Sequence, residues 1–330
     1  MRLTVIPKQR DYGIETLRCL LMVGICLIHA TAYSSDRCWW MGNIASCSVV
    51  AFVFISAWYG LKFKWRKIVS LAGMAAWCGA IVVGIDCCLM GGGGNYVDII
   101  QSFMKQFSSY WFLWCYIVLM MVAPMIDTAL DACSDVKDAI RIVLPIVVLV
   151  FGWNFIASEA SVTLRTRLPA PVGFGSHTFL ALVGIYAVGR FTRKWLTGFI
   201  PSGWKLAAVC IGLMAIVALD PRLGRYYSPL AVLVAACWVM AFKDVKILAW
   251  AERVVRFVAP SLFAVYLLHV SKVGNNALVW LDGKCAFVGY GGTRSVLVSV
   301  IVFVICIAVD MPRRAFAYCI LAVKNAKDNQ

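Results

Sequence analysis

The sequence predicts an all-α protein, a polytopic transmembrane helix bundle of about ten helices with both termini in the cytoplasm. Three observations predict this fold class. The chain of 330 residues is 62% hydrophobic and only 14% charged, whereas soluble proteins average about 45–50% apolar and about 25% charged residues. Many apolar runs approach the roughly 20 residues that a helix needs to cross a bilayer. Basic residues gather in short clusters between those runs, as they do in cytoplasmic loops.

Each apolar run is assigned to one membrane helix of a single transmembrane domain that covers residues 1–330. The predicted spans are 14–34, 43–61, 68–90, 108–126, 142–158, 176–191, 204–219, 227–242, 258–281 and 287–309. The longest exposed stretches, 91–107 and 159–175, are too short to bury a core of their own. We therefore expect the protein to act within the membrane or at its two surfaces.

The distribution of Lys and Arg sets the orientation. With the N-terminus inside, 22 of the 31 basic residues fall in cytoplasmic segments. The others are Arg37, Lys105, Arg165, Arg167, Arg222, Arg225, Lys272, Lys284 and Arg294. The opposite orientation would invert this ratio, so the positive-inside rule predicts cytoplasmic termini. We expect a multi-pass protein of the cell inner (plasma) membrane.

The net charge of +15 does not indicate nucleic-acid binding, because the basic residues follow the membrane topology. The sequence also lacks a glycine-rich phosphate loop motif and an aromatic RNA-binding signature. Its 14 cysteines include no C-x-x-C pair and no Cys/His spacing typical of a metal site. We expect no nucleic-acid partner and no metal.

The first span carries ionisable residues on one helix face. Arg18 and His29 are eleven residues apart, which is three turns plus about 20°, so they share a face at a separation of about 16 Å. Glu15 lies one turn before Arg18 and can pair with it. Ionisable groups inside a membrane are costly and usually mark function. The alternative is that Arg18 only reaches the interface and His29 bonds a neighbouring helix. We take His29, Arg18 and Glu15 as candidate catalytic residues.

The span 258–281 carries a second polar stripe. Tyr266, His269, Lys272 and Asn276 would fall within roughly a third of one helix circumference. Such a stripe should face protein or water rather than lipid, where it either lines a cavity or joins helices. Tyr266 and His269 are candidate substrate-binding residues.

A basic loop follows the second span and contains Lys62, Lys64, Arg66 and Lys67. Its simplest interpretation is positive-inside topology. The sharper hypothesis is a cytoplasmic site for a phosphorylated donor, because Lys and Arg bind phosphate well. Under that hypothesis Lys64, Arg66 and Lys67 are candidate substrate-binding residues.

Together these residues resemble the acyltransferase-3 family of membrane acyltransferases. Glu15, Leu17-Arg18 and His29 are similar to the opening motif of that family. Four further stretches resemble its later motifs in the right order, and they are Phe52 to Ser56, Trp111 to Leu113 with Pro124, Gly184 to Arg190, and Ser261 to His269. The chain departs from the family pattern in having Glu15 for the more usual Asp, Ala57 for a common Gly, and Lys64 and Lys67 for a pair of arginines.

The resemblance implies transfer of an acyl group, often acetyl, from cytoplasmic acyl-CoA to a hydroxyl of a carbohydrate, frequently a cell-surface glycan. Acyl-CoA would then be the donor substrate, with no bound cofactor. Basic groups at the cytoplasmic mouth would hold the CoA phosphates. His29 would either take the proton of the attacking hydroxyl or carry the acyl group covalently.

A competing class is a non-enzymatic transporter or flippase of a glycan or lipid-linked sugar. Ten helices with buried polar groups would serve that function equally well. Consumption of acyl-CoA separates the two classes.

Overall fold

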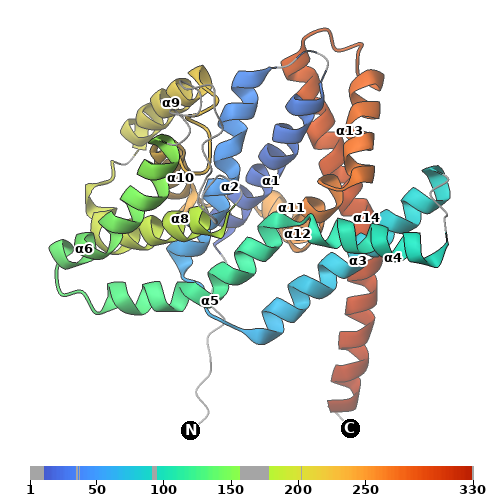
Figure 1. Ribbon diagram of the computed structural model, residues 1–330, viewed down its shortest axis with the longest axis horizontal. Helices are drawn as coiled ribbons and strands as arrows, with labels where there is room; N and C mark the ends of the chain where they lie inside the picture. The colour runs from blue at the N-terminus through green and yellow to red at the C-terminus, as the bar shows by residue number, and fades with distance from the viewer. Residues whose placement is uncertain are drawn as a thin grey trace.

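The computed structural model is all-helical over the residues that it describes, which are 11–34, 36, 38–90, 95–156, 178–201 and 203–328. It confirms the predicted fold class (Figure 1). In chain order the elements are α1 (Tyr12–Tyr33), α2 (Trp39–Tyr59), α3 (Trp65–Met90), α4 (Tyr96–Ser108), α5 (Trp111–Asp131), α6 (Val136–Val147), η1 (Val148–Gly152), α8 (Phe179–Phe191), η2 (Thr192–Leu196), η3 (Thr197–Phe199), α9 (Gly203–Leu219), α10 (Pro229–Phe242), α11 (Ala249–Val258), η4 (Ala259–Ser261), α12 (Leu262–His269), α13 (Lys272–Lys284) and α14 (Gly291–Asp328).

Six segments of the described chain are long and apolar enough to cross a membrane: α1, α2, most of α3, α5, residues Val136–Ile156 and the first part of α14. Three other predicted spans form the shorter helices α8, α9 and α10. The expected count of about ten helices is roughly consistent with this architecture. The chain is a multi-pass membrane protein.

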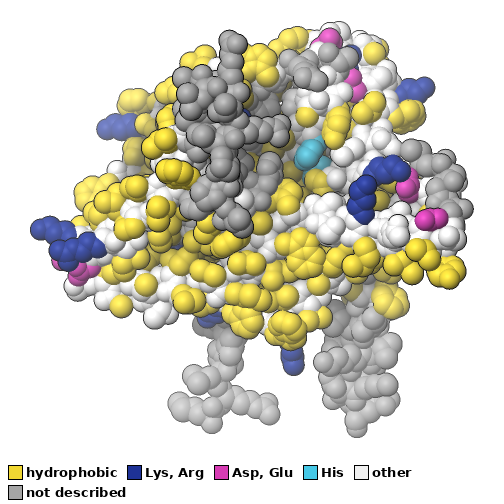
Figure 2. Space-filling model, in the orientation of Figure 1, with side chains coloured by type: hydrophobic (Ala, Val, Ile, Leu, Met, Phe, Trp, Pro, Cys, Tyr) yellow, Lys and Arg dark blue, Asp and Glu magenta, His cyan; other side chains and the backbone are white. Residues whose placement is uncertain are grey.

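Apolar side chains cover much of the outer surface. Leu144, Val148, Leu149 and Ile156 are each more than half exposed along Val136–Ile156. In Figure 2 hydrophobic side chains spread over the flank of the bundle, and Lys and Arg gather toward its edges. A water-soluble protein rarely exposes so large an apolar surface. We therefore expect this flank to contact lipid.

The helix α1 lies at the centre of the bundle and packs against α2, α10, α12, α13 and α14. Small residues allow close approach: a Cβ at Gly24 of α1 would overlap the Oγ of Ser48 on α2. Such small-residue contacts are typical of membrane helices, which have no hydrophobic drive to associate within lipid. In Figure 1, α1 begins and α14 ends toward the same side of the molecule, as the predicted topology requires.

One predicted exposed stretch contains an unpredicted helix. Residues 95–108 form α4 behind a capping box, in which the side chain of Asn95 accepts from the Asp98 amide and the Asp98 side chain accepts from the Asn95 amide. No residue of α4 is buried, so the helix adds no core, in agreement with the expectation for the described part of 91–107. The other stretch, 159–175, lies outside the described residues.

The prediction of one continuous helix over 258–281 is wrong. The chain breaks between α12 and α13, and the two parts of the bent pair meet at 88°. The Ser271 side chain caps the new helix by accepting from the Gly274 amide at 3.0 Å. A Cβ at Gly274 would overlap the carbonyls of Leu268 and His269, so only glycine permits this close turn. Lys272 and Asn276 therefore leave the predicted polar stripe, and both are exposed.

Candidate active site

A cavity of about 520 Å³ lies between α1, α2, α3, α5 and α12. Its walls are mostly apolar, with a few ionisable and hydroxyl groups among them. The lining residues are Glu15, Arg18, Met22, Ile25, Ile28, His29, Val49, Phe52, Ser56, Lys67, Leu71, Ser109, Trp111, Phe112, Tyr116, Tyr226, Ala259, Pro260, Leu262, Phe263, Tyr266 and Val270. A cavity of this size with few convergent polar groups is typical of a ligand site.

One wall is the face of α1 that the sequence predicted. Glu15, Arg18 and His29 all line the cavity, and Arg18 Nη1 pairs with Glu15 Oε1 at 3.0 Å. The helix begins at this point because the Asp11 carboxylate accepts from the Ile14 amide at 3.1 Å. The Tyr59 hydroxyl at the end of α2 donates to the same carboxylate at 2.6 Å, which holds the two helix ends together.

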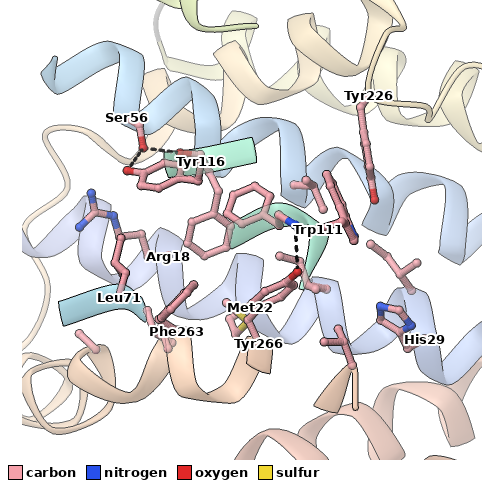
Figure 3. Close-up of a pocket in the computed structure, with 18 of the residues that line it drawn as sticks. Arg18, Met22, His29, Ser56, Leu71, Trp111, Tyr116, Tyr226, Phe263 and Tyr266 are labelled. Atoms are coloured by element: carbon pink, nitrogen blue, oxygen red, sulfur yellow. Dashed lines mark hydrogen bonds between the residues drawn. The ribbon is translucent and has the colours of Figure 1, made fainter. Parts of the chain in front are cut away.

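Arg18 and His29 lie at opposite ends of the cavity (Figure 3). The Arg18 side chain is about one-third exposed, at 34%, and is therefore partly accessible from outside the protein. His29 lies three turns further along α1 and is half-buried. The cavity thus has a cation at one end and an imidazole at the other.

A second histidine stands beside His29. The rings of His29 and His269 meet edge to face with centroids 5.1 Å apart. His269 is fully buried, and its Nδ1 lies 2.7 Å from the Val265 carbonyl oxygen. Because a carbonyl oxygen only accepts, Nδ1 carries a proton, and in the neutral ring Nε2 carries the lone pair. That Nε2 has no hydrogen-bond partner among the described residues.

Aromatic side chains form the opposite wall. The Tyr266 hydroxyl of α12 accepts from the Phe112 amide of α5 at 3.3 Å, which satisfies a free amide at the start of α5. The Tyr116 hydroxyl lies 3.1 Å from Ser56 Oγ of α2. Trp111 stacks on Tyr226 with a centroid distance of 5.7 Å. Figure 3 shows these rings between Arg18 and His29.

The basic loop contributes only in part. Lys67 lines the cavity, and its Nζ lies 5.7 Å from the centroid of the Tyr116 ring. All three residues are exposed, but Lys64 and Arg66 are not among the lining residues. The cavity therefore receives one of the three basic residues that the sequence nominated.

The predicted site residues thus fall into three groups. Glu15, Arg18, His29, Lys67 and Tyr266 share the cavity, His269 contacts His29 from behind it, and the remaining two lie outside. Sequence reasoning missed the contribution of Tyr226, which precedes α10 in a loop and lies in no motif. It also missed Tyr116, whose hydroxyl looks like any other in an apolar helix.

Comparisons with known proteins give one partial relative and one family. The chain is similar to a UPF0060 membrane protein of Methylibium petroleiphilum, with 32% identity over 105 residues that cover 29% of this chain and 91% of the relative. That name assigns no activity. No solved structure matches the chain. A family model described as an acyltransferase domain matches residues 11–311. This match includes every residue of the cavity, and on it the chain belongs to the acyltransferase-3 family of membrane acyltransferases.

Proposed function

We propose that this protein is a membrane O-acyltransferase that moves an acyl group, in the first instance acetyl, from cytoplasmic acyl-CoA to a hydroxyl of a cell-surface or lipid-linked carbohydrate. The observation that carries the proposal is that Arg18 and His29 line one cavity from opposite ends. Membership of an acyltransferase family supports acyl transfer over a transporter or flippase.

The dimensions of the cavity suit the donor. CoA carries its phosphates at one end and its thioester at the end of a long flexible arm. Arg18 and His29 are eleven residues apart on α1, about 16 Å along the axis, which is of the order of the length of that arm. In the proposed pose Arg18 and Lys67 bind phosphate oxygens and the arm runs along the apolar wall to His29. Glu15 holds the Arg18 guanidinium in place through the 3.0 Å pair.

The chemistry is an acyl transfer in which His29 moves the proton. The acceptor oxygen attacks the thioester carbonyl while an imidazole nitrogen of His29 takes the hydroxyl proton. The new bond is between that oxygen and the acyl carbon, and the bond that breaks is the carbon–sulfur bond. The CoA sulfur leaves as thiolate and receives the proton from His29, so the enzyme ends unchanged.

A covalent route uses the same residue. In that route His29 attacks the thioester first and carries the acyl group until the hydroxyl arrives. Both routes need a neutral His29 with a free nitrogen lone pair. The routes differ in whether acylated His29 accumulates when donor is supplied without acceptor, which intact-mass measurement of the purified protein distinguishes.

His269 acts on His29 rather than on substrate. It is fully buried behind the cavity wall. Its ring packs against the His29 ring with an angle of 70° between the two planes, and this contact would fix the orientation of His29. Orientation of a catalytic base to within about 10–20° is needed for efficient transfer. We therefore assign His269 a positioning role, in place of the direct substrate contact expected from the sequence.

The location follows from the substrates. The donor is made in the cytoplasm and the proposed acceptor lies outside, so the enzyme would sit in the plasma membrane. The test is mass spectrometry of surface glycans from cells with and without the gene. A mass difference of one acyl group supports the proposal and names acceptor and acyl group together. Identical glycans and lipid-linked sugars in the two strains would refute it.

A further inference from the structure

The basic segment between α2 and α3 is tied to α8 at its first residues. Gly60 ends α2 with φ of +78°, a conformation that side-chain-bearing residues rarely adopt. The next residue, Leu61, is buried, and its amide donates to the Tyr186 hydroxyl of α8 at 3.0 Å. The direction in which the chain leaves α2 is therefore set by a side chain of a distant helix.

The Tyr186 hydroxyl is itself held in place. It donates to the Asp127 carboxylate of α5, with oxygen distances of 2.9 and 3.0 Å. Asp127 also pairs with Nε of Arg190 at 2.7 Å, and both side chains are less than one-fifth exposed. One hydroxyl thus accepts from Leu61 and donates to Asp127, so the chain of hydrogen bonds is complete from backbone to ion pair. We call Asp127, Tyr186 and Arg190 the loop anchor.

Two residues of the loop anchor lie close to Gly60. A Cβ at Gly60 would lie 3.4 Å from Arg190 Nη1 and 3.6 Å from Asp127 Oδ2. The ion pair therefore packs directly against the backbone at the point where α2 ends. A change that moves the pair would therefore remove its packing against this turn.

The next basic residues, Arg193 and Lys194 of η2, are exposed but also bond to neighbouring helix ends. Arg193 Nη1 donates to the Trp58 carbonyl, and its guanidinium lies 6.0 Å from the Trp58 ring centroid. Lys194 Nζ donates to the Leu130 carbonyl at 2.7 Å. These cations satisfy carbonyls at the C-terminal ends of α2 and α5, which lack partners within their own helices. Arg193 and Lys194 are thus both hydrogen-bonded to backbone carbonyls of the protein.

The geometry points to a role for the loop anchor in donor binding: we propose that Asp127, Tyr186 and Arg190 are positioning residues that set the path of residues 60–67, so that Lys67 reaches the cavity. None of the three lines the cavity, whereas Lys67 does and sits over Tyr116. The inference rests on the proposed donor site and adds to it the residues that place its basic loop.

The kinetic test uses Tyr186→Phe and Asp127→Asn in the full-length protein in lipid nanodiscs. Both substitutions keep the side-chain shape: Tyr186→Phe removes the hydroxyl that bonds Leu61 and Asp127, and Asp127→Asn removes the negative charge. We expect the KM for acetyl-CoA to rise about 10-fold, the usual effect of losing one such bond, with kcat within about 2-fold. Asp138→Asn is the matched control, because it breaks a carboxylate–guanidinium pair of α6 that is mostly exposed and touches neither the segment nor the cavity.

The second test needs no activity. The amide of Leu61 should exchange with deuterium about 5- to 10-fold faster in Tyr186→Phe, since its acceptor is gone, while Asp138→Asn leaves this exchange unchanged. Unchanged exchange would show that the anchor does not hold the segment. Faster exchange with unchanged KM would overturn the link to the donor.

The two tests also separate this inference from the proposed function. If the wild-type protein transfers no acyl group from acetyl-CoA, both the proposed donor site and the role of the loop anchor in donor binding are refuted. Exchange at Leu61 then still decides whether the anchor orders the segment.

Discussion

His29 and His269 meet edge to face with ring centroids 5.1 Å apart, although 240 residues separate them in the sequence. The contact joins α1 to the last residue of α12, directly before the 88° break. A base on one helix is thereby oriented by a buried ring on another. The break matters for this contact, because α12 ends where His269 faces α1 and the chain then turns away as α13.

The contact predicts that His269 affects turnover rather than donor affinity. His269→Phe keeps an aromatic ring but loses both nitrogens, so His29 loses its polar neighbour. We expect kcat to fall about 10- to 100-fold, as small misplacements of catalytic groups do, with the KM for acyl-CoA unchanged. Steady-state kinetics measures both. A raised KM with normal kcat would return His269 to the role of a substrate contact.

Arg18 is predicted to act on the donor. Arg18→Ala should raise the KM for acyl-CoA about 10- to 100-fold, the value of one charge-assisted contact of roughly 1.5–3 kcal/mol. Arg18→Lys keeps the charge but loses the planar fork, so it should recover only part of this loss. Arg141→Ala, on the exposed face of α6, is the control. If Arg18→Ala changes acceptor use and leaves donor KM unchanged, the donor enters from the other end.

Of the basic residues in the loop, Lys67 lines the cavity and Lys64 does not, and this difference is testable. Lys67→Gln should raise the donor KM about 10-fold through loss of a phosphate contact. Lys64→Gln should leave it unchanged, because Lys64 lies outside the cavity. A fusion reporter after α14 verifies that orientation is kept in both variants. Equal effects of the two substitutions would contradict this difference.

The face of α1 was predictable because it depends only on helical periodicity. Arg18 and His29 sit on the same helix, so their spacing in the sequence sets their spacing in space. The same holds for Glu15, which pairs with Arg18 as its position one turn earlier requires. These three residues could be placed together without knowledge of any other helix.

The rest of the site depends on contacts between distant segments. The approach of His269 to His29 and of Tyr226 to Trp111 follows from tertiary packing, which no local pattern encodes. The break after α12 was missed because hydropathy continues through Val270, whereas the turn is made by Ser271 and Gly274. Lys64 and Lys67 look equivalent in sequence and are separated only by the path of the chain.

The most direct test of acyl transfer at this cavity supplies labelled acetyl-CoA to the cytoplasmic face of inside-out membrane vesicles. The label that enters glycan or lipid-linked sugar is then measured for the wild-type protein, His29→Ala and the control Asp138→Asn. Loss of a general base costs about 10²–10⁴-fold in rate. We expect transfer by wild type and control, and at least about a 100-fold decrease for His29→Ala inserted at the same level. Full transfer by His29→Ala, or no transfer by the wild type, would contradict this expectation.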